Sequence, residues 1–88
     1  MHQLIPAIAF PPGEILKEEL EASDLTQQDL AAIEEGLPET ITEIIQGTQQ
    51  ITPEIAARLS EALGTSPEFW MKLEDNYRIY LANQTGNN

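Results

Sequence analysis

Proline, glycine and small polar residues divide this chain into short segments, and the apolar residues within each segment recur at helical spacing. No segment alternates apolar and polar residues with a period of two, as a half-buried strand would. The spacing predicts five helices, over residues 14–22, 27–33, 38–46, 53–63 and about 67–81. A chain of 88 residues suits one small domain that buries roughly 60–65% of its unfolded surface. The predicted fold class is therefore all-α.

Residues that start and stop helices support these boundaries. Thr26 and Thr52 stand where N-caps are expected, and Pro53 follows its cap at the first helical position, which tolerates proline. Gly47 and Gly64 stand where a helix ends in a left-handed residue. The second to fourth helices are thus bounded by residues whose backbone preferences match the predicted ends.

The helices define three parts of the chain: an N-terminal arm at residues 1–12, a helical domain at residues 13–82, and a polar tail at residues 83–88 that we expect to fray. The longest apolar run is far too short to span a bilayer. No basic segment precedes an apolar one at the N-terminus, so no secretory signal is predicted. We expect a cytoplasmic protein without a membrane partner.

Composition favours a binding protein over an enzyme. There is no cysteine and only one histidine, which excludes a disulfide framework, a cysteine-ligated metal and a serine–histidine–aspartate triad. The adjacent pair Glu34 and Glu35 lacks the alternating acids of a calcium loop, and we interpret it as solvated charge. The sequence predicts no catalytic residue, no metal and no cofactor. A net charge of −11 predicts attraction to basic proteins and repulsion of phosphate backbones.

Two short helices joined by a turn containing Gly36 form a helix-turn-helix over residues 26–46. The motifs around it are Pro12-Gly13-Glu14-Ile15-Leu16, Ile51-Thr52-Pro53-Glu54 and Leu63-Gly64-Thr65-Ser66-Pro67-Glu68-Phe69-Trp70. At this spacing the chain resembles the HigA-type antitoxins of the Xre/Cro–C1 helix-turn-helix family, over about residues 12–82. The resemblance implies a single five-helix lambda-repressor-like helix-turn-helix domain.

The resemblance also implies a function. HigA-type antitoxins are dimers that bind a small, basic, mRNA-cleaving toxin of the HigB type, and they repress their own operon by placing the third helix in the major groove. Carried over by position, the residues implied to contact DNA are Gln27, Gln28, Glu39, Thr40, Thr42, Glu43, Gln46, Thr48, Gln49 and Gln50.

The charge pattern departs from that family. Between Lys17 and Arg58 the chain has ten acidic residues and no basic one, and the turn at residues 36–38 lies about one residue later than in the family pattern. Affinity for a duplex comes largely from lysine and arginine, so we expect weak binding to operator DNA. An alternative is a protein-interaction module that kept the fold and binds only a basic protein. A more remote one is an acidic mimic of DNA.

Large apolar residues exceed what one small core can hold. On the fifth helix we expect Phe69, Leu73 and Tyr77 to face inward, and we leave Trp70 and Tyr80 open between the core and an interface. The apolar residues of the arm either pack back over the bundle or contact a partner. The predicted partner or dimer surface comprises Leu4, Ile5, Ile8, Phe10, Trp70 and Tyr80.

Overall fold

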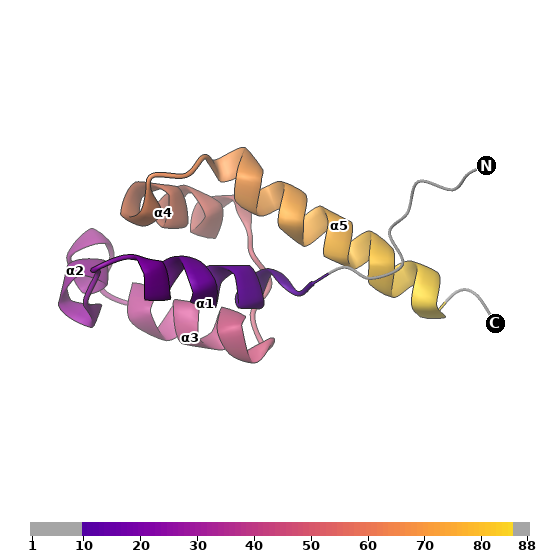
Figure 1. Ribbon diagram of the computed structural model, residues 1–88, viewed down its shortest axis with the longest axis horizontal. Coiled ribbons are helices and arrows are strands. Elements are labelled where there is room, and N and C mark those ends of the chain that lie inside the picture. Colours follow the sequence, from indigo (N-terminus) through magenta and orange to yellow (C-terminus); the bar gives the residue numbers. More distant parts are fainter. Residues whose placement is uncertain (1–9, 86–88) are drawn as a thin grey trace.

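The computed structural model describes residues 10–85 and contains, within that range, five α-helices and no strand (Figure 1). None of these helices combines the length and apolar character needed to cross a membrane. In chain order the helices are α1 (Pro12–Ala22), α2 (Gln27–Ile33), α3 (Leu37–Gln46), α4 (Pro53–Leu63) and α5 (Pro67–Thr85). The predicted all-α class is confirmed.

The helix boundaries match the sequence-based prediction closely at α2 and α4 and less well elsewhere. Helix α1 begins two residues early, at Pro12, because proline and the following glycine fit the first turn, where backbone N–H groups need no intrahelical partner. Helix α5 continues through Thr85 instead of ending near Leu81. The residues from Asn83 onward are polar, but none is a helix breaker before the glycine at position 86, so polarity alone is a poor stop signal.

The predicted caps form. The Thr26 hydroxyl accepts a hydrogen bond from the Asp29 backbone N–H at 3.1 Å, and the Asp29 carboxylate accepts one from the Thr26 N–H at 3.0 Å. Thr52 accepts from the N–H of Ile55 at 3.2 Å. Gly47 and Gly64 have φ of 86° and 76°, a left-handed backbone that suits glycine. These local bonds fix where α2 and α4 begin and where α3 and α4 end.

One apolar core lies between the helices, and α3 supplies more of it than any other helix does. Its members come from all five helices and from the loop before α4. The buried apolar residues are Leu16, Leu30, Leu37, Ile41, Ile44, Ile51, Ala56, Leu59 and Trp70. Leu16, Ala56, Leu59 and Trp70 have no exposed surface.

Trp70 corrects the expectation for α5. It is fully buried, whereas Phe69, expected inside, is 40% exposed. Successive residues of a helix point about 100° apart, so only one of the two can face the core. Trp70 takes that place and donates its indole N–H to the Thr65 hydroxyl at 2.6 Å. Phe69 packs edge-on against it, with ring centroids 5.0 Å apart, and Leu73 and Tyr77 are half-buried.

A buried carboxylate joins α5 to the loop before α4. Glu74 is only 5% exposed and accepts a hydrogen bond from the Ile51 backbone N–H at 3.2 Å. Its other oxygen accepts from the Arg78 guanidinium at 2.6 Å, and that guanidinium lies over the ring of Tyr77. The carboxylate therefore satisfies a buried backbone donor while its charge is balanced by arginine.

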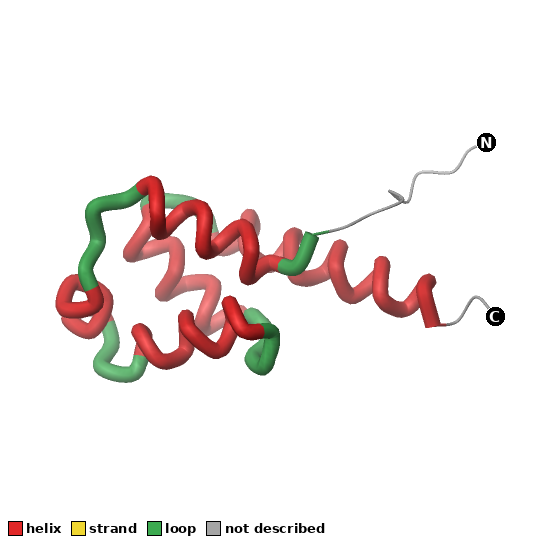
Figure 2. The backbone as a smooth tube through the Cα atoms, turned by 60° about the horizontal axis from the view of Figure 1, so that its bottom comes forward, coloured by secondary structure: helices red, strands yellow, loops and turns green. Residues whose placement is uncertain are grey.

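Helix α1 lies alongside α3, and the two make a very close contact at Gly13 (Figures 1 and 2). A Cβ atom on residue 13 would stand 2.4 Å from the backbone oxygen of Ile44 and 2.9 Å from the Cα atom of Ile45. Real Cβ atoms do not approach backbone so closely, so the absence of a side chain at Gly13 permits this packing. The approach sets how deep a groove remains between the two helices.

Replacing Gly13 with alanine should force α1 away from α3. We expect Gly13→Ala to lower the free energy of unfolding by roughly 1–3 kcal/mol, as overpacking does, which corresponds to about 4–8 °C in Tm per kcal/mol for a domain of this size. Gly36→Ala is the matched control, because a Cβ there meets nothing within 4 Å and its φ is −88°. Equal melting temperatures for the two variants would contradict the close-packing argument.

Candidate nucleic-acid interface

The helix-turn-helix consists of α2, a three-residue turn and α3. The Leu37 N–H donates to the Glu34 carbonyl at 2.9 Å, which closes the turn. Leu30 on α2 and Leu37 and Ile41 on α3 are all buried, so apolar contacts hold the two helices at a fixed angle. The outer side of α3 is consequently presented to solvent as a preformed surface.

Helix α3 exposes a polar stripe. Glu39, Glu43 and Gln46 are exposed and recur at i, i+4 and i+7, which places them in one line along the helix. Thr42 is also exposed, and its hydroxyl donates to the Pro38 carbonyl at 3.0 Å. Thr40 is half-buried and lines a shallow depression with residues of α4. Thr40 is therefore separated from this stripe and from Thr42.

The remaining residues implied to contact DNA flank α3. Gln27 and Gln28 are exposed at the start of α2. In the loop after α3, Thr48 and Gln50 are exposed and Gln49 is half-buried. The Thr48 hydroxyl donates to the Glu43 carbonyl at 3.2 Å, and the Gln49 amide donates to the Gln50 carbonyl at 2.7 Å. These bonds shape the loop and occupy donors that would otherwise be available to phosphate oxygens.

The charged residues on this face are almost all acidic. Arg58 on α4 is the first cation after Lys17, and it is engaged by Glu34 of the turn at 3.1 Å and by Glu61 at 3.8 Å. These pairs are half-exposed and contribute little stability. The two ion pairs hold the Arg58 guanidinium beside Glu34 of the turn and Glu61 of α4. Glu39 and Glu43 form no ion pair with any cation among residues 10–85.

The described residues of the predicted partner or dimer surface differ in how far they are exposed to solvent. Trp70 is a core residue and is withdrawn from that surface. Tyr80 is half-buried and stacks on Tyr77 with ring centroids 6.2 Å apart. Phe10 is 63% exposed. Leu4, Ile5 and Ile8 lie outside the described residues. Within the described range, no three metal-binding side chains gather, at Glu34 and Glu35 or elsewhere.

Three features of the structure are not predicted by the sequence patterns. Gly13 stands in a motif shared with the family, and its tight packing inside α1 is a role that a glycine within a helix often has. Glu74 follows Trp70 by four residues, so an acid on the buried stripe was a visible signal. The spacing of Ile41, Ile44 and Ile45 predicts that all three lie on the apolar face of α3, but Ile45 is 36% exposed.

Comparison with known proteins fits this geometry. The family described as Helix-turn-helix (HTH_3) matches residues 16–70, more than half of the chain. The chain belongs to the helix-turn-helix family HTH_3. This membership confirms the family expected from the sequence motifs and accounts for the α2–turn–α3 arrangement.

Two solved structures share the fold of this helix-turn-helix protein. One is an addiction module antidote protein of the HigA family from Coxiella burnetii, with 36% identity, a TM-score of 0.72, and coverage of 89% of this chain and 86% of that one. The other is described as an antidote protein of a plasmid maintenance system from Nostoc punctiforme, with 33% identity, a TM-score of 0.74, and coverage of 90% and 87%. The resemblance to HigA-type antidotes thus extends to three dimensions.

The curated relatives include HTH-type transcriptional regulators and a virulence-associated protein. An HTH-type transcriptional regulator of Escherichia coli K12, YddM, is 31% identical over 84% of this chain and 79% of its own length. The virulence-associated protein I of Dichelobacter nodosus is 34% identical over 86% of this chain and 71% of its own length. The helix-turn-helix protein is thus similar both to regulators and to antidotes.

Proposed function

We propose that this protein is the antitoxin of a toxin–antitoxin pair and neutralises a basic, mRNA-cleaving toxin of the HigB type by binding it. The observation that carries the proposal is the likeness to two antidote proteins, at 33–36% identity over about nine-tenths of the chain. In this role the chain is a binding protein and not an enzyme, and it acts in the cytoplasm, where mRNA is cleaved.

The charge of the chain supports a basic partner. Fifteen acidic residues against four basic ones give a net charge of −11. Such a charge steers a basic protein into encounter, raising association rates from roughly 10⁵–10⁶ towards 10⁸ M⁻¹s⁻¹ at low salt. Specific binding needs an apolar anchor as well, because exposed carboxylates alone discriminate poorly among cations.

The antitoxin proposal is tested by co-production with the basic protein encoded beside this chain's gene. We expect that protein alone to arrest growth and cleave mRNA, and this chain to restore growth and co-purify with it. The association rate should fall as salt rises, since exposed charges are screened within about 10 Å at 0.1 M. Growth arrest that this chain leaves unrelieved, or no basic protein encoded there, would refute the proposal.

Repression of its own operon is the second part of the proposal. The residues proposed to meet DNA are the exposed stripe of α3, with Thr42, together with the glutamines of α2 and the loop after α3. Glutamate can accept a hydrogen bond from cytosine N4, so Glu39 and Glu43 allow base contacts while weakening the attraction to phosphates. A protein-interaction module that binds only a basic protein is the alternative, and the lack of cations around α3 favours it.

Charge reversal on α3 separates these two functions. With so few cations, the wild-type chain should bind its own promoter fragment weakly, with a shallow slope of log affinity against log salt. Glu39→Arg with Glu43→Arg should strengthen and steepen that binding without unfolding the domain, since both sites are exposed. Glu68→Arg with Asp75→Arg, exposed on α5, is the control of equal charge. Nanomolar wild-type binding with a steep slope would establish the plain repressor and remove the alternative.

A homodimer through the distal part of α5 completes the proposal. In Figures 1 and 2 this end of α5 extends past the other helices. Ile79 is 53% exposed there, next to the stacked Tyr77 and Tyr80. Residues 76–85 carry one charge, that of Arg78. Two chains of charge −11 repel each other, so a segment that exposes Ile79 and is nearly free of charge is where they can meet.

Placing a carboxylate at the centre of this segment should separate the copies. We expect Ile79→Glu to weaken self-association at least about tenfold, the equivalent of 1.4 kcal/mol, while helicity persists, with the mass followed by sedimentation. Gln28→Glu adds the same charge at an exposed site on α2, which lies at the opposite end of the molecule in Figure 1, and should leave the dimer intact. A wild-type chain that sediments as a monomer at tens of micromolar would refute the dimer.

A further inference from the structure

We propose that a basic, amphipathic helical segment of a partner protein docks in an apolar groove formed by the end of α1, by α2 and by α3. The groove has a volume of about 230 Å³. The apolar side chains that line its wall are Leu20, Leu25, Leu30, Pro38, Ile41 and Ile45. This inference rests on the proposed function, because it assigns the toxin's binding surface.

Several apolar side chains that line the groove are partly exposed to solvent. Leu20 and Leu25 pack against the core but remain half-buried, and Ile45 is 36% exposed. Pro38 and Ile45 lie seven residues apart on α3, on the same side of that helix. The groove is therefore an elongated apolar trough beside α3, a shape suited to the apolar stripe of one helix.

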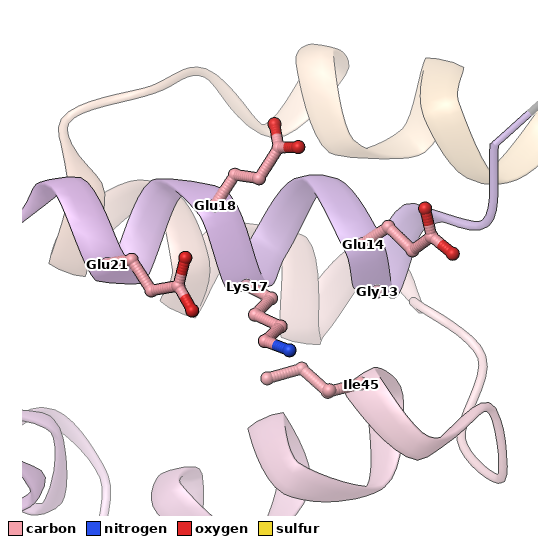
Figure 3. Close-up of a pocket in the computed structure, with 6 residues that line it drawn as sticks. All are labelled: Gly13, Glu14, Lys17, Glu18, Glu21 and Ile45. Atoms are coloured by element: carbon pink, nitrogen blue, oxygen red, sulfur yellow. The ribbon is translucent and has the colours of Figure 1, made fainter.

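An acidic groove continues this trough along α1. It has a volume of about 440 Å³ and shares Ile45 with the apolar groove. Figure 3 shows Lys17 of α1 and Ile45 of α3 projecting towards each other, with Glu21 beside them. Gly13, Glu14 and Glu18 complete the lining, so three carboxylates and one ammonium line this groove, and the side chains of Glu14 and Glu18 project away from Lys17.

These carboxylates are available to a partner. No ion pair joins Glu14, Glu18 or Glu21 to another residue of the range 10–85. Their spacing of four and three residues puts them on one line of α1. An apolar trough next to an acidic line is complementary to a helix with an apolar stripe and adjacent lysines or arginines.

The negative charge of the chain favours a basic polypeptide in the groove over a second copy of this chain or a DNA duplex. A second copy of this chain would bring its own charge of −11 to an acidic groove, and a duplex would bring phosphates. A basic polypeptide is attracted, and its apolar side chains can replace water against Leu20, Leu25 and Ile45. The rim of the apolar groove includes Gln27 and Thr42, so a docked segment would cover residues proposed to meet DNA.

The groove is tested with a fluorescent amphipathic helical peptide made of lysine and leucine, added to the full chain. We expect the peptide to bind, and its amide shift changes in NMR spectra to centre on Leu20, Leu25 and Ile45. Ile45→Asn should weaken binding at least about tenfold, since a few well-packed apolar anchors carry most of the binding energy of an interface. Phe69→Asn is the matched control, because that side chain is similarly exposed, at 40%, on α5.

Two further measurements complete the test. Glu14→Gln, Glu18→Gln and Glu21→Gln together should flatten the salt dependence of peptide binding, and a peptide with alanine in place of leucine should bind at least about tenfold more weakly. Absent peptide binding, equal affinity of Ile45→Asn and wild type, or shifts centred elsewhere would overturn the proposal.

The same variant separates this inference from the proposed function. If the neighbouring basic protein binds Ile45→Asn as tightly as wild type, the groove assignment fails and the antitoxin function stands. If no neighbouring toxin binds while the peptide still requires Ile45, the antitoxin function fails and the groove remains a docking site for basic helices.

Discussion

Helix α1 can lie against α3 only because residue 13 has no side chain. With the Ile44 carbonyl 2.4 Å from where a Cβ would stand, the start of α1 is pressed onto the backbone of α3. That contact buries Leu16 and Ile44 and leaves Ile45 at the edge. Both grooves beside α3 share Ile45, so their depth depends on this approach. Stability and the shape of the surface thus rest on the same glycine.

The contact between α5 and the loop before α4 depends on a buried polar group as well as on apolar packing. Glu74 brings a carboxylate to the Ile51 N–H, a donor that the start of α4 leaves without a backbone partner. Arg78 balances the charge from one turn further along α5, at the edge of the bundle. Because Glu74 and Trp70 lie on one side of α5, a single helix face both fills the core and fixes the loop before α4.

Local chemistry made the fold predictable from the sequence. The threonine caps and the terminal glycines act within a few residues, so they set where α2 and α4 begin and where α3 and α4 end without reference to the rest of the molecule. Choices that depend on tertiary packing were not predictable in the same way. The preference for Trp70 over Phe69 depends on Thr65 and on the rotation of α5. The groove at Ile45 depends on how near α1 comes, which periodicity on α3 cannot indicate.

The acidic residues and the apolar groove lie on the same face of the protein, where DNA and a basic partner would both bind. The acids of α1 and α3 weaken attraction to phosphate but favour a cationic polypeptide, and Ile45 supplies the apolar contact that charge alone lacks. Because Thr42 and Gln27 border the apolar groove, a basic segment and a duplex would compete for overlapping residues. If the affinity for DNA is low, a basic protein would displace the duplex readily from the helix-turn-helix face. By reciprocity of linked equilibria, any operator DNA bound there would weaken the affinity for that partner by the same factor.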